Sequence, residues 1–395
     1  MMINIEPKIC DTTLRDGRQM PHFYPTVEEC VEIAHILNEI GVEQIEMFSP
    51  NYNPKDKTLA RRLHDEGLIN RIMFWHRALK SDLEKTINLL PEVKAVALSM
   101  PTSKVHQRVK LRITPKEVIE TVIETIDYAK DHGLYVSVNA EESTGTELYY
   151  LLQFAKAAKD HKADRIRICD TLGRLTPSLT HETIKVIRKV AQIPIEFHAH
   201  NDMGLAVANT LAAFEEGAEW ASTTIAGIGE RAGNASLEQL LMALYKQYGI
   251  DKYKIRQLKR ACDLVVKAGY NMAINHPVVG SNMFKHESGI HFDGISKSVE
   301  CYELIRPDEI GAQINGILDR DVVGETSGRA NILAILAHYD KPVDKNDLIV
   351  QEMLSEVQRQ FLEGRKKAFS PEEVLQLYNN LRKKEIKTRV EKLSV

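Results

Sequence analysis

The sequence predicts an α/β protein, a closed (β/α)8 TIM barrel with a mainly helical C-terminal region. Short apolar segments alternate with amphipathic helical segments eight times over roughly 240 residues, which requires a parallel sheet with helical crossovers. No glycine-rich phosphate loop follows the first strand, which argues against the competing doubly wound open sheet. From about Asp251 the alternation stops and helical patterns dominate. We therefore expect loops at the carboxyl ends of eight strands to carry the chemistry.

The first half of the barrel begins with a strand expected at 3–10, which ends at the polar run DTTLRDGRQ of residues 11–19. A polar cluster after a short apolar run indicates a strand that leads into a functional loop. Thr26 then caps a helix, with Glu28 and Glu29 in its first turn and Gly41 at its end. The same reasoning predicts strands at 42–48, 72–75 and 93–98, and helices at 58–66 and 81–90.

The second half opens with Thr114 and Pro115, a threonine cap followed by proline at the first helical position. This helix runs to Asp131 and stops at Gly133. The remaining expected strands are 134–138, 165–169, 195–199 and 221–226, and the remaining expected helices are 147–161, 180–191, 205–216 and 237–248.

The chain divides by composition into three expected parts. Residues 1–270 form the catalytic barrel, and residues 271–340 form a subdomain that contains a stretch rich in glycine, asparagine and histidine. Residues 341–395 form a charged helical C-terminal extension, which has helical patterning around 348–361 and 371–384 and a joint at 341–346.

Composition excludes several classes of function. A net charge of -3 gives no global attraction for nucleic acid or an anionic membrane, so small molecules are the expected partners. The five cysteines are scattered and show no CxxC spacing, which indicates a reducing compartment without disulfides or a thiolate zinc site. The N-terminus lacks an apolar signal region, and no apolar run reaches the ~20 residues of a membrane span. We expect a cytoplasmic protein.

The strongest chemical signal is the stretch 195–202, IEFHAHND. On a strand, His198 and His200 point to the same side, about 7 Å apart. In a barrel the first, seventh and eighth strands are neighbours, which brings Asp11 or Asp16 and the glycine-rich loop 227–235 close to the two histidines. Two imidazoles, a carboxylate and an amide or waters suit Mg, Mn or Zn. The alternative is a pair of exposed or internally bonded histidines.

Other residues at strand ends have a structural and a chemical interpretation. Arg15 is either a loop ion pair or, beside a metal, a group that holds a carboxylate or polarises a ketone, with Glu46 available to orient it. Thr171 either binds a substrate carboxylate or caps the next helix. His291, outside the barrel, is either structural or a proton-transfer group.

Together these residues resemble the isopropylmalate synthase/homocitrate synthase family. The motifs are DTTLRDG at 11–17, HAHND at 198–202 and GIGERAGNA at 227–235. The family's subdomain is matched by SGIH at 288–291, by Tyr302-Glu303 and by residues 324–329. The resemblance covers about residues 8–340, and it is specific because several uncommon motifs occur in the right order.

The resemblance implies a Claisen-type condensation in which acetyl-CoA adds to the ketone of a 2-oxo acid, and thioester hydrolysis drives the reaction forward. It implies that a divalent metal chelates the ketone and carboxylate oxygens as a Lewis acid. The implied metal ligands are Asp16, His198, His200 and Asn234.

By the same resemblance Arg15 stabilises the forming alkoxide, Glu46 orients Arg15, and Glu141 lies near the site. The implied substrate-binding residues, besides Arg15, are Thr171 for the carboxylate, Gln19 and His76. His291 would reach a neighbouring subunit's barrel and help to deprotonate the acetyl methyl group, which makes a domain-swapped homodimer part of the prediction.

The 2-oxo acid is expected to be dicarboxylic, such as 2-oxoglutarate. Residues 136–141 and 75–78 look more like short homocitrate synthases, and isopropylmalate synthases usually carry a longer C-terminal regulatory domain than this chain has room for. Two residues depart from the pattern: Arg18 stands where glutamate is common, and Gly145 where arginine is frequent. An added cation at the mouth can favour a dianionic or phosphonate-bearing substrate.

Several alternatives stay open. A sibling synthase would form 2-isopropylmalate, citramalate, citrate by the Re-type reaction, or phosphonomethylmalate. An acyl-CoA lyase would run carbon–carbon cleavage on the same barrel, although lyase chains typically lack the His291 subdomain. Two further readings are a metal-binding scaffold without activity and a metal-dependent barrel aldolase that needs no CoA.

Overall fold

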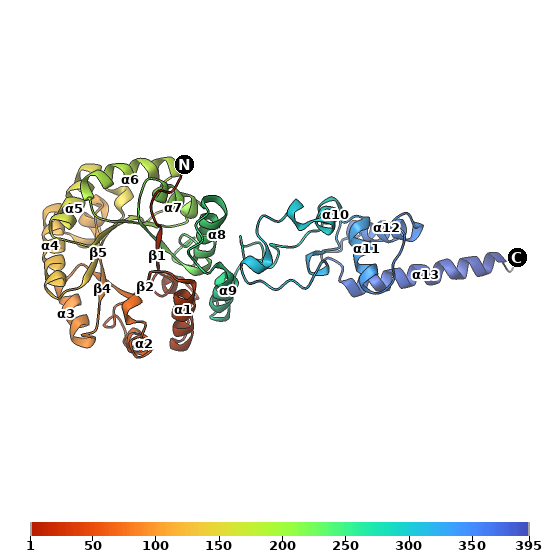
Figure 1. Ribbon diagram of the computed structural model, residues 1–395, viewed down its shortest axis with the longest axis horizontal. Helices are drawn as coiled ribbons and strands as arrows, with labels where there is room; N and C mark the ends of the chain where they lie inside the picture. Colours follow the sequence, from red (N-terminus) through yellow and green to blue (C-terminus); the bar gives the residue numbers. More distant parts are fainter. Residues whose placement is uncertain (1, 394–395) are drawn as a thin grey trace. The chain divides into compact units, whose positions relative to one another are not determined.

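The structure is a computed structural model that describes residues 2–393, and it divides into two compact units, one through Met272 and one from Ala273 (Figure 1). In the first unit eight strands form a closed barrel in sequence order, with every neighbouring pair parallel and β1 paired to β8. The predicted barrel is confirmed. The strands are β1 (Lys8–Asp11), β2 (Gln44–Phe48), β3 (Ile72–Arg77), β4 (Ala95–Pro101), β5 (Tyr135–Glu141), β6 (Arg165–Asp170), β7 (Ile195–Ala199) and β8 (Trp220–Thr223).

Helices surround the barrel, and their caps follow the sequence signals. Thr26 and Thr114 each form a capping box, in which the threonine hydroxyl accepts the backbone N–H three residues on and a glutamate bonds back. The helices are α1 (Val27–Ile40), α2 (Pro54–Asp65), α3 (Lys80–Leu89), α4 (Pro115–Asp131), α5 (Leu148–Asp160), α6 (Pro177–Ala191), α7 (Ala206–Glu215), α8 (Leu237–Tyr248) and α9 (Leu258–Lys267).

Several boundaries differ from the sequence-based expectation: β1 begins at Lys8 rather than at residue 3, and β4 and β5 each extend three residues further. Three other differences have local reasons. Helix α2 begins at Pro54 because the Asn53 side chain caps it and proline occupies the first helical position. Helix α6 begins at Pro177 for the same reason, with Thr176 as its cap. Strand β8 ends at Thr223 because a short 3-10 turn follows, in which Ala226 adopts a φ of 55°.

The second unit contains α10 (Gly289–Lys297), α11 (Arg329–His338), α12 (Leu348–Leu362) and α13 (Pro371–Leu393). Helices α11, α12 and α13 share one apolar core, so residues on both sides of position 340 pack together. The division at 340/341 and its assignment to a subdomain and an extension stay predictions. The buried core residues are Val323, Ile332, Ile335, Leu336, Ile349, Val350, Met353, Leu354, Val357, Phe369 and Val374.

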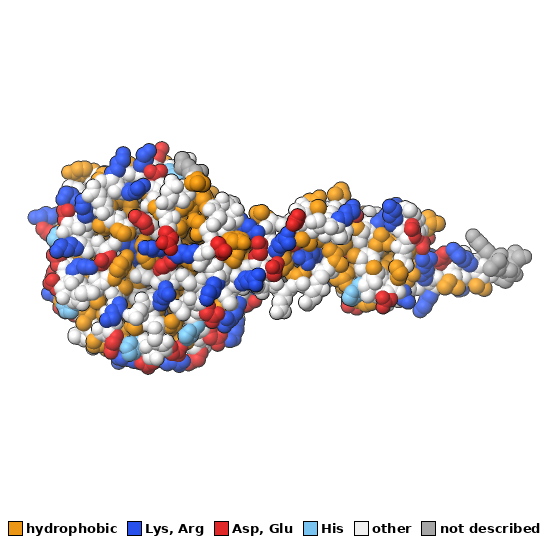
Figure 2. All heavy atoms as spheres, in the orientation of Figure 1, with side chains coloured by type: hydrophobic (Ala, Val, Ile, Leu, Met, Phe, Trp, Pro, Cys, Tyr) orange, Lys and Arg blue, Asp and Glu red, His pale blue; other side chains and the backbone are white. Residues whose placement is uncertain are grey.

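The surface carries mixed charge. Figure 2 shows lysine and arginine side chains interspersed with aspartate and glutamate over the visible face of each unit. Among residues 2–393, none of the helices combines the length and the apolar character that crossing a bilayer would need.

Candidate active site

The carboxyl ends of the barrel strands enclose a cavity of about 260 Å³. Seven of the predicted site residues line it: Arg15, Asp16, Gln19, Glu141, Thr171, His198 and His200. The other lining residues are Trp75, Ser99, Lys110, Asn139, Arg167, Cys169 and Glu230. The barrel therefore brings residues from the first, fifth, sixth and seventh strand ends into one site.

A possible metal site occupies one side of this cavity. Asp16 Oδ2 lies 3.4 Å from His198 Nε2, and His198 Nε2 lies 3.3 Å from His200 Nε2. One ligand atom from each of the three residues lies within 4.8 Å of the others, and all three side chains are buried. Burial lowers the pKa of His198 well below its ordinary value, so the imidazole is neutral, which is the form that binds metals.

Asn234 completes this set from the loop after β8. Its backbone pairs with that of His200, and both polar atoms of its buried amide lack a hydrogen-bond partner. A Cβ atom at Gly229 would lie 2.0 Å from Asn234 Oδ1, so glycine there makes room for the amide. Buried polar atoms normally have partners. Two imidazoles, a carboxylate and an unpartnered amide oxygen fit a divalent cation.

Arg15 lies beside this cluster and is held from three directions. Its Nε donates to Glu46 Oε1 at 2.7 Å, and its Nη1 contacts the Asp16 carboxylate and, at 3.3 Å, Gln19 Oε1. The guanidinium carbon lies 5.7 Å from the ring centre of Trp75. A buried guanidinium fixed in this way is oriented before any substrate arrives.

Below Arg15, alternating charges continue down the barrel interior. Glu46 Oε2 lies 2.6 Å from Arg167 Nη2, Arg167 Nε lies 2.9 Å from Glu196 Oε1, and Arg165 Nε lies 2.8 Å from Glu196 Oε2. We call these six residues the lumen ladder: Asp16, Arg15, Glu46, Arg167, Glu196 and Arg165. Burial alone would raise the pKa of Glu46, but Arg167 and Arg15 hold it at about 2.

Sequence reasoning missed the lower half of the ladder. Arg165 and Arg167 alternate along the segment RIRIC, and Glu196 falls on the same face as His198. This period-two placement of charges within a buried strand was the available signal.

Thr171 and Glu141 line the cavity from the ends of β6 and β5. The Thr171 hydroxyl accepts the backbone N–H of Glu142 at 2.8 Å, and α6 is capped by Thr176, so Thr171 is not a helix cap. Its hydroxyl hydrogen remains available to a ligand. The Glu141 carboxylate lies 2.6 Å from Lys110 Nζ.

Two predicted residues lie elsewhere. His76 does not line the cavity: its Nδ1 bonds the Phe74 carbonyl at 2.9 Å and its Nε2 the Thr86 hydroxyl of α3 at 2.8 Å. Side chains alternate along a strand, so it is Trp75 that faces inward. The substrate-binding role predicted for His76 is therefore not carried forward. His291 lies on α10 of the second unit, 4.3 Å from Tyr302 between ring centres, and its role stays a prediction.

The two departures from the family pattern have local explanations. Arg18 is almost fully buried and pairs with the Asp56 carboxylate of α2, so it does not add a free cation at the cavity mouth, contrary to our hypothesis. A Cβ atom at Gly145 would lie 2.4 Å from Glu142 Oε1. Glycine there leaves room for the Glu142 carboxylate, which lies 3.3 Å from Arg174 Nη2.

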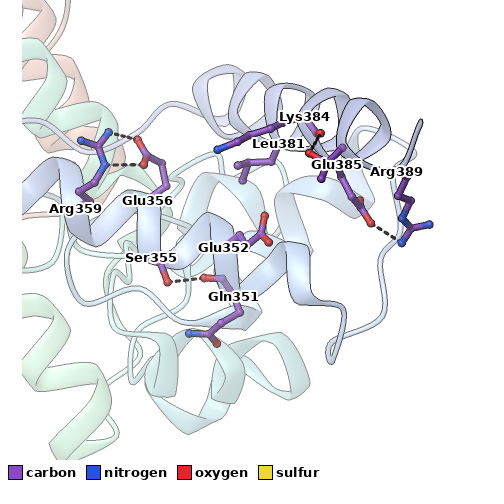
Figure 3. Close-up of a pocket in the computed structure, with 10 residues that line it drawn as sticks. Gln351, Glu352, Ser355, Glu356, Arg359, Leu381, Lys384, Glu385 and Arg389 are labelled. Carbon is purple, nitrogen blue, oxygen red and sulfur yellow. Dashed lines mark hydrogen bonds and ion pairs between the residues drawn. The ribbon is translucent and has the colours of Figure 1, made fainter. Parts of the chain in front are cut away.

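A larger cavity, of about 630 Å³, lies between α12 and α13 of the second unit (Figure 3). Four of its charged side chains are paired along their own helices, Glu356 with Arg359 and Glu385 with Arg389. It brings together no cluster of metal ligands among the described residues. The barrel cavity is therefore the better candidate for chemistry.

Comparison with known proteins connects both units to one family. The HMGL-like family model matches residues 6–265, and the model described as homocitrate synthase post-HMGL domain-like matches residues 278–360. The 2-isopropylmalate synthase 2 of Caldanaerobacter subterraneus subsp. tengcongensis is 37% identical over 94% of this chain and 95% of its own length. Homocitrate synthase AksA of Methanopyrus kandleri is 40% identical over 88% of this chain and 86% of its own length.

A solved structure shares the fold of the barrel. Hydroxymethylglutaryl-CoA lyase from Pseudomonas aeruginosa superposes with a TM-score of 0.61 at 19% identity, covering 69% of this chain and 96% of the lyase.

Proposed function

The chain belongs to the isopropylmalate synthase/homocitrate synthase family and is an acyltransferase, and from this premise we propose that it condenses acetyl-CoA with a 2-oxo acid, most readily 2-oxoglutarate. The observation that supports this chemistry best is the buried Arg15, fixed between Glu46 and Asp16 at the edge of the Asp16, His198 and His200 cluster. A ketone held at that cluster would present its oxygen to a preoriented cation.

Four residues would hold the metal: Asp16, His198, His200 and Asn234. When bound, a divalent cation there supplies Lewis-acid polarisation of the substrate ketone. Arg15 stabilises the negative charge that develops on the ketone oxygen, and it does so with little reorganisation because the lumen ladder already fixes its guanidinium. Thr171 donates its free hydroxyl hydrogen to the substrate carboxylate.

The proton of the acetyl methyl group must be removed before the carbon–carbon bond forms. We assign this step to His291 of a partner subunit, with Glu141 near the reacting atoms. The methyl C–H bond breaks, its proton passes to the imidazole, and its electron pair forms the bond to the ketone carbon. The π pair of the ketone moves to its oxygen, which then takes up a proton and becomes the hydroxyl of the product. Water then cleaves the thioester and releases the CoA thiol. A monomer by solution mass measurement at assay concentrations would contradict the domain-swapped homodimer.

Fewer observations support the choice of 2-oxoglutarate as the 2-oxo acid. The relative named 2-isopropylmalate synthase 2 aligns over 95% of its own length, so chain length does not separate the two kinds of synthase, contrary to our expectation. Arg18 is paired and supplies no free cation. What supports 2-oxoglutarate is the similarity of residues 136–141 to homocitrate synthases, and the homocitrate synthase domain match over 278–360.

A thiol-release assay with acetyl-CoA tests this choice. The acceptors are 2-oxoglutarate, oxaloacetate, pyruvate and 2-oxoisovalerate, each assayed with Mg²⁺, Mn²⁺ and Zn²⁺. We expect the highest kcat/KM with 2-oxoglutarate. A higher value with 2-oxoisovalerate would replace it with an isopropylmalate-type reaction, and turnover of an oxo acid without acetyl-CoA would favour an aldolase.

An acyl-CoA lyase is the second candidate, because the barrel superposes on hydroxymethylglutaryl-CoA lyase. That likeness covers only 69% of this chain, and the region after the barrel matches a homocitrate synthase domain instead. Cleavage of hydroxymethylglutaryl-CoA without any condensation would reverse this preference. Metal binding without turnover of any acyl-CoA would favour the alternative of a metal-binding scaffold without activity.

A further inference from the structure

A basic segment, residues 104–112, follows β4 on the same rim as the active-site cavity. Its sequence is KVHQRVKLR, and positions 106–111 form a π-helix that ends at Arg112 with a φ of 57°. π-helical turns are rare and occur often at functional sites. Lys110 of this segment lines the cavity itself, so the segment extends from the reaction centre onto the exposed surface of the barrel mouth.

Two of the four lysine and arginine side chains of this segment have no partner among the described residues. Lys104 pairs with Glu147 and Lys110 with Glu141. The side chains of Arg108 and Arg112 are exposed and make no hydrogen bond or ion pair with any residue that the structure describes. Most other arginines of the barrel, including Arg15, Arg165 and Arg167, are paired with carboxylates.

An apolar strip lies beside these cations. Val105 and Val109 are 68% and 70% exposed, although valine is usually buried. Val105 and Val109 are four residues apart, and so are Arg108 and Arg112. Residues at this spacing lie on the same side of a helical turn. Gln107 anchors the segment from beneath: its buried side chain donates to the Thr102 carbonyl at 2.9 Å.

We propose that Arg108 and Arg112 bind the phosphate groups at the nucleotide end of acetyl-CoA, with Val105 and Val109 contacting the apolar parts of the same molecule. This assignment rests on the proposed function. Coenzyme A carries its thiol and its phosphates at opposite ends, so an enzyme that holds the thioester at a buried site must meet the phosphates near the cavity mouth. Guanidinium groups bind phosphate through paired hydrogen bonds.

The test is charge reversal, R108E/R112E, assayed with two acetyl donors. One donor is acetyl-CoA, and the other is acetyl-pantetheine, which has the same thioester but no nucleotide. We expect KM for acetyl-CoA to rise by at least about tenfold, a factor equivalent to 1.4 kcal/mol. We expect KM for acetyl-pantetheine and KM for the 2-oxo acid to stay within about twofold of the parent.

The matched control is K185E/K189E on α6, which reverses two exposed lysines at the same four-residue spacing. It should leave KM for acetyl-CoA unchanged. The parent's KM for acetyl-CoA should also rise with ionic strength, and this rise should be smaller in R108E/R112E because exposed charge pairs are screened by salt.

Two failures have different meanings. If R108E/R112E condenses acetyl-CoA with the parent's KM, or raises KM equally for both donors, the assignment of the phosphate site is wrong and the proposed function stands. If the parent protein uses neither donor with any 2-oxo acid, the proposed function itself fails. A circular dichroism spectrum and melting temperature that match the parent establish that the variant is folded.

Discussion

The barrel lumen and the core of the second unit are both buried, but they are built from opposite kinds of side chain. The lumen ladder consists of three arginines and three carboxylates, each in contact with the next from Arg165 up to Asp16. The core shared by α11, α12 and α13 is aliphatic and aromatic. Buried ion pairs add little net stability over a well-packed apolar core, because desolvation offsets the Coulomb attraction.

The difference teaches what each interior is for. An apolar core tolerates repacking at moderate cost, because its contacts have no direction. Each ladder contact fixes both partners in distance and angle, and the ladder ends at Arg15 and Asp16, the second of which belongs to the metal-ligand cluster. We infer that the ladder sets the position of Arg15, whereas the second core supplies cohesion. The next predictions test this contrast, beginning with the largest expected effect.

Arg167→Met should destabilise the barrel by about 3–5 kcal/mol, because Glu46 and Glu196 would be left buried without their shared cation. Leu336→Ala in the second core should cost about 2–5 kcal/mol by creating a cavity. The chain has two tryptophans, Trp75 and Trp220, and both belong to the barrel. Urea unfolding followed by tryptophan fluorescence therefore reports the barrel, while far-UV circular dichroism reports both units.

We expect Arg167→Met to move the fluorescence transition, and Leu336→Ala to move only part of the circular dichroism transition. Equal shifts of both signals in both variants would mean that the two units unfold together. The two interiors would then not make separate contributions to stability.

Glu46→Gln should lower kcat by about 100-fold, because it keeps the shape of the side chain but removes the charge that orients Arg15. The affinity for Mn²⁺, measured by calorimetric titration, should stay close to that of the parent, since Glu46 is not among the proposed ligands. Parent-like turnover would show that Arg15 needs no support from the ladder. A large loss of Mn²⁺ affinity would show that the ladder positions the metal ligands instead.

Asp321→Asn should have the smallest effect and should depend on pH. Burial raises the pKa of Asp321 from 3.8 to about 7, against the opposing hydrogen bond from Asn331. The folded state therefore binds this proton more tightly than the unfolded chain. The resulting stabilisation is complete below the unfolded pKa and is lost as pH rises through about 7.

The neutral asparagine removes that loss. Thermal melts should show Asp321→Asn a few degrees more stable than the parent at pH 8, with little difference at pH 4. Two outcomes would contradict the raised pKa of Asp321. One is a melting temperature of the parent's second unit that is higher at pH 8 than at pH 4. The other is an equal gain in the melting temperature of Asp321→Asn at both pH values.

Most of the fold and half of the site could be predicted from the sequence. Thr26, Thr114 and Gly41 act locally, so their caps and stops can be recognised without tertiary information. His198 and His200 share a face because side chains alternate along any strand. The order of strands around a closed barrel placed Asp11 or Asp16 and the loop 227–235 beside them, and the family resemblance singled out Asp16 and Asn234.

The rest depended on information that a pattern of residue types does not contain. His76 and Trp75 differ by one position of strand register, and which one faces inward depends on the whole barrel. Arg165 and Arg167 interrupt a strand that reads as apolar, because their charges are compensated by residues on other strands. Arg18 has its partner 38 positions away, on α2.

The closure of the barrel between its first and last strands has a consequence for synthesis on the ribosome. Asp16 emerges long before His198. Because Lys8 of β1 pairs with Trp220 of β8, these two strands can pair only after Trp220 has been synthesised. Until that late segment leaves the exit tunnel, β1 lacks its β8 partner, and the closed barrel that holds Asp16 beside His198 cannot form. The proposed metal site is therefore complete only after β1 and β8 have closed the barrel.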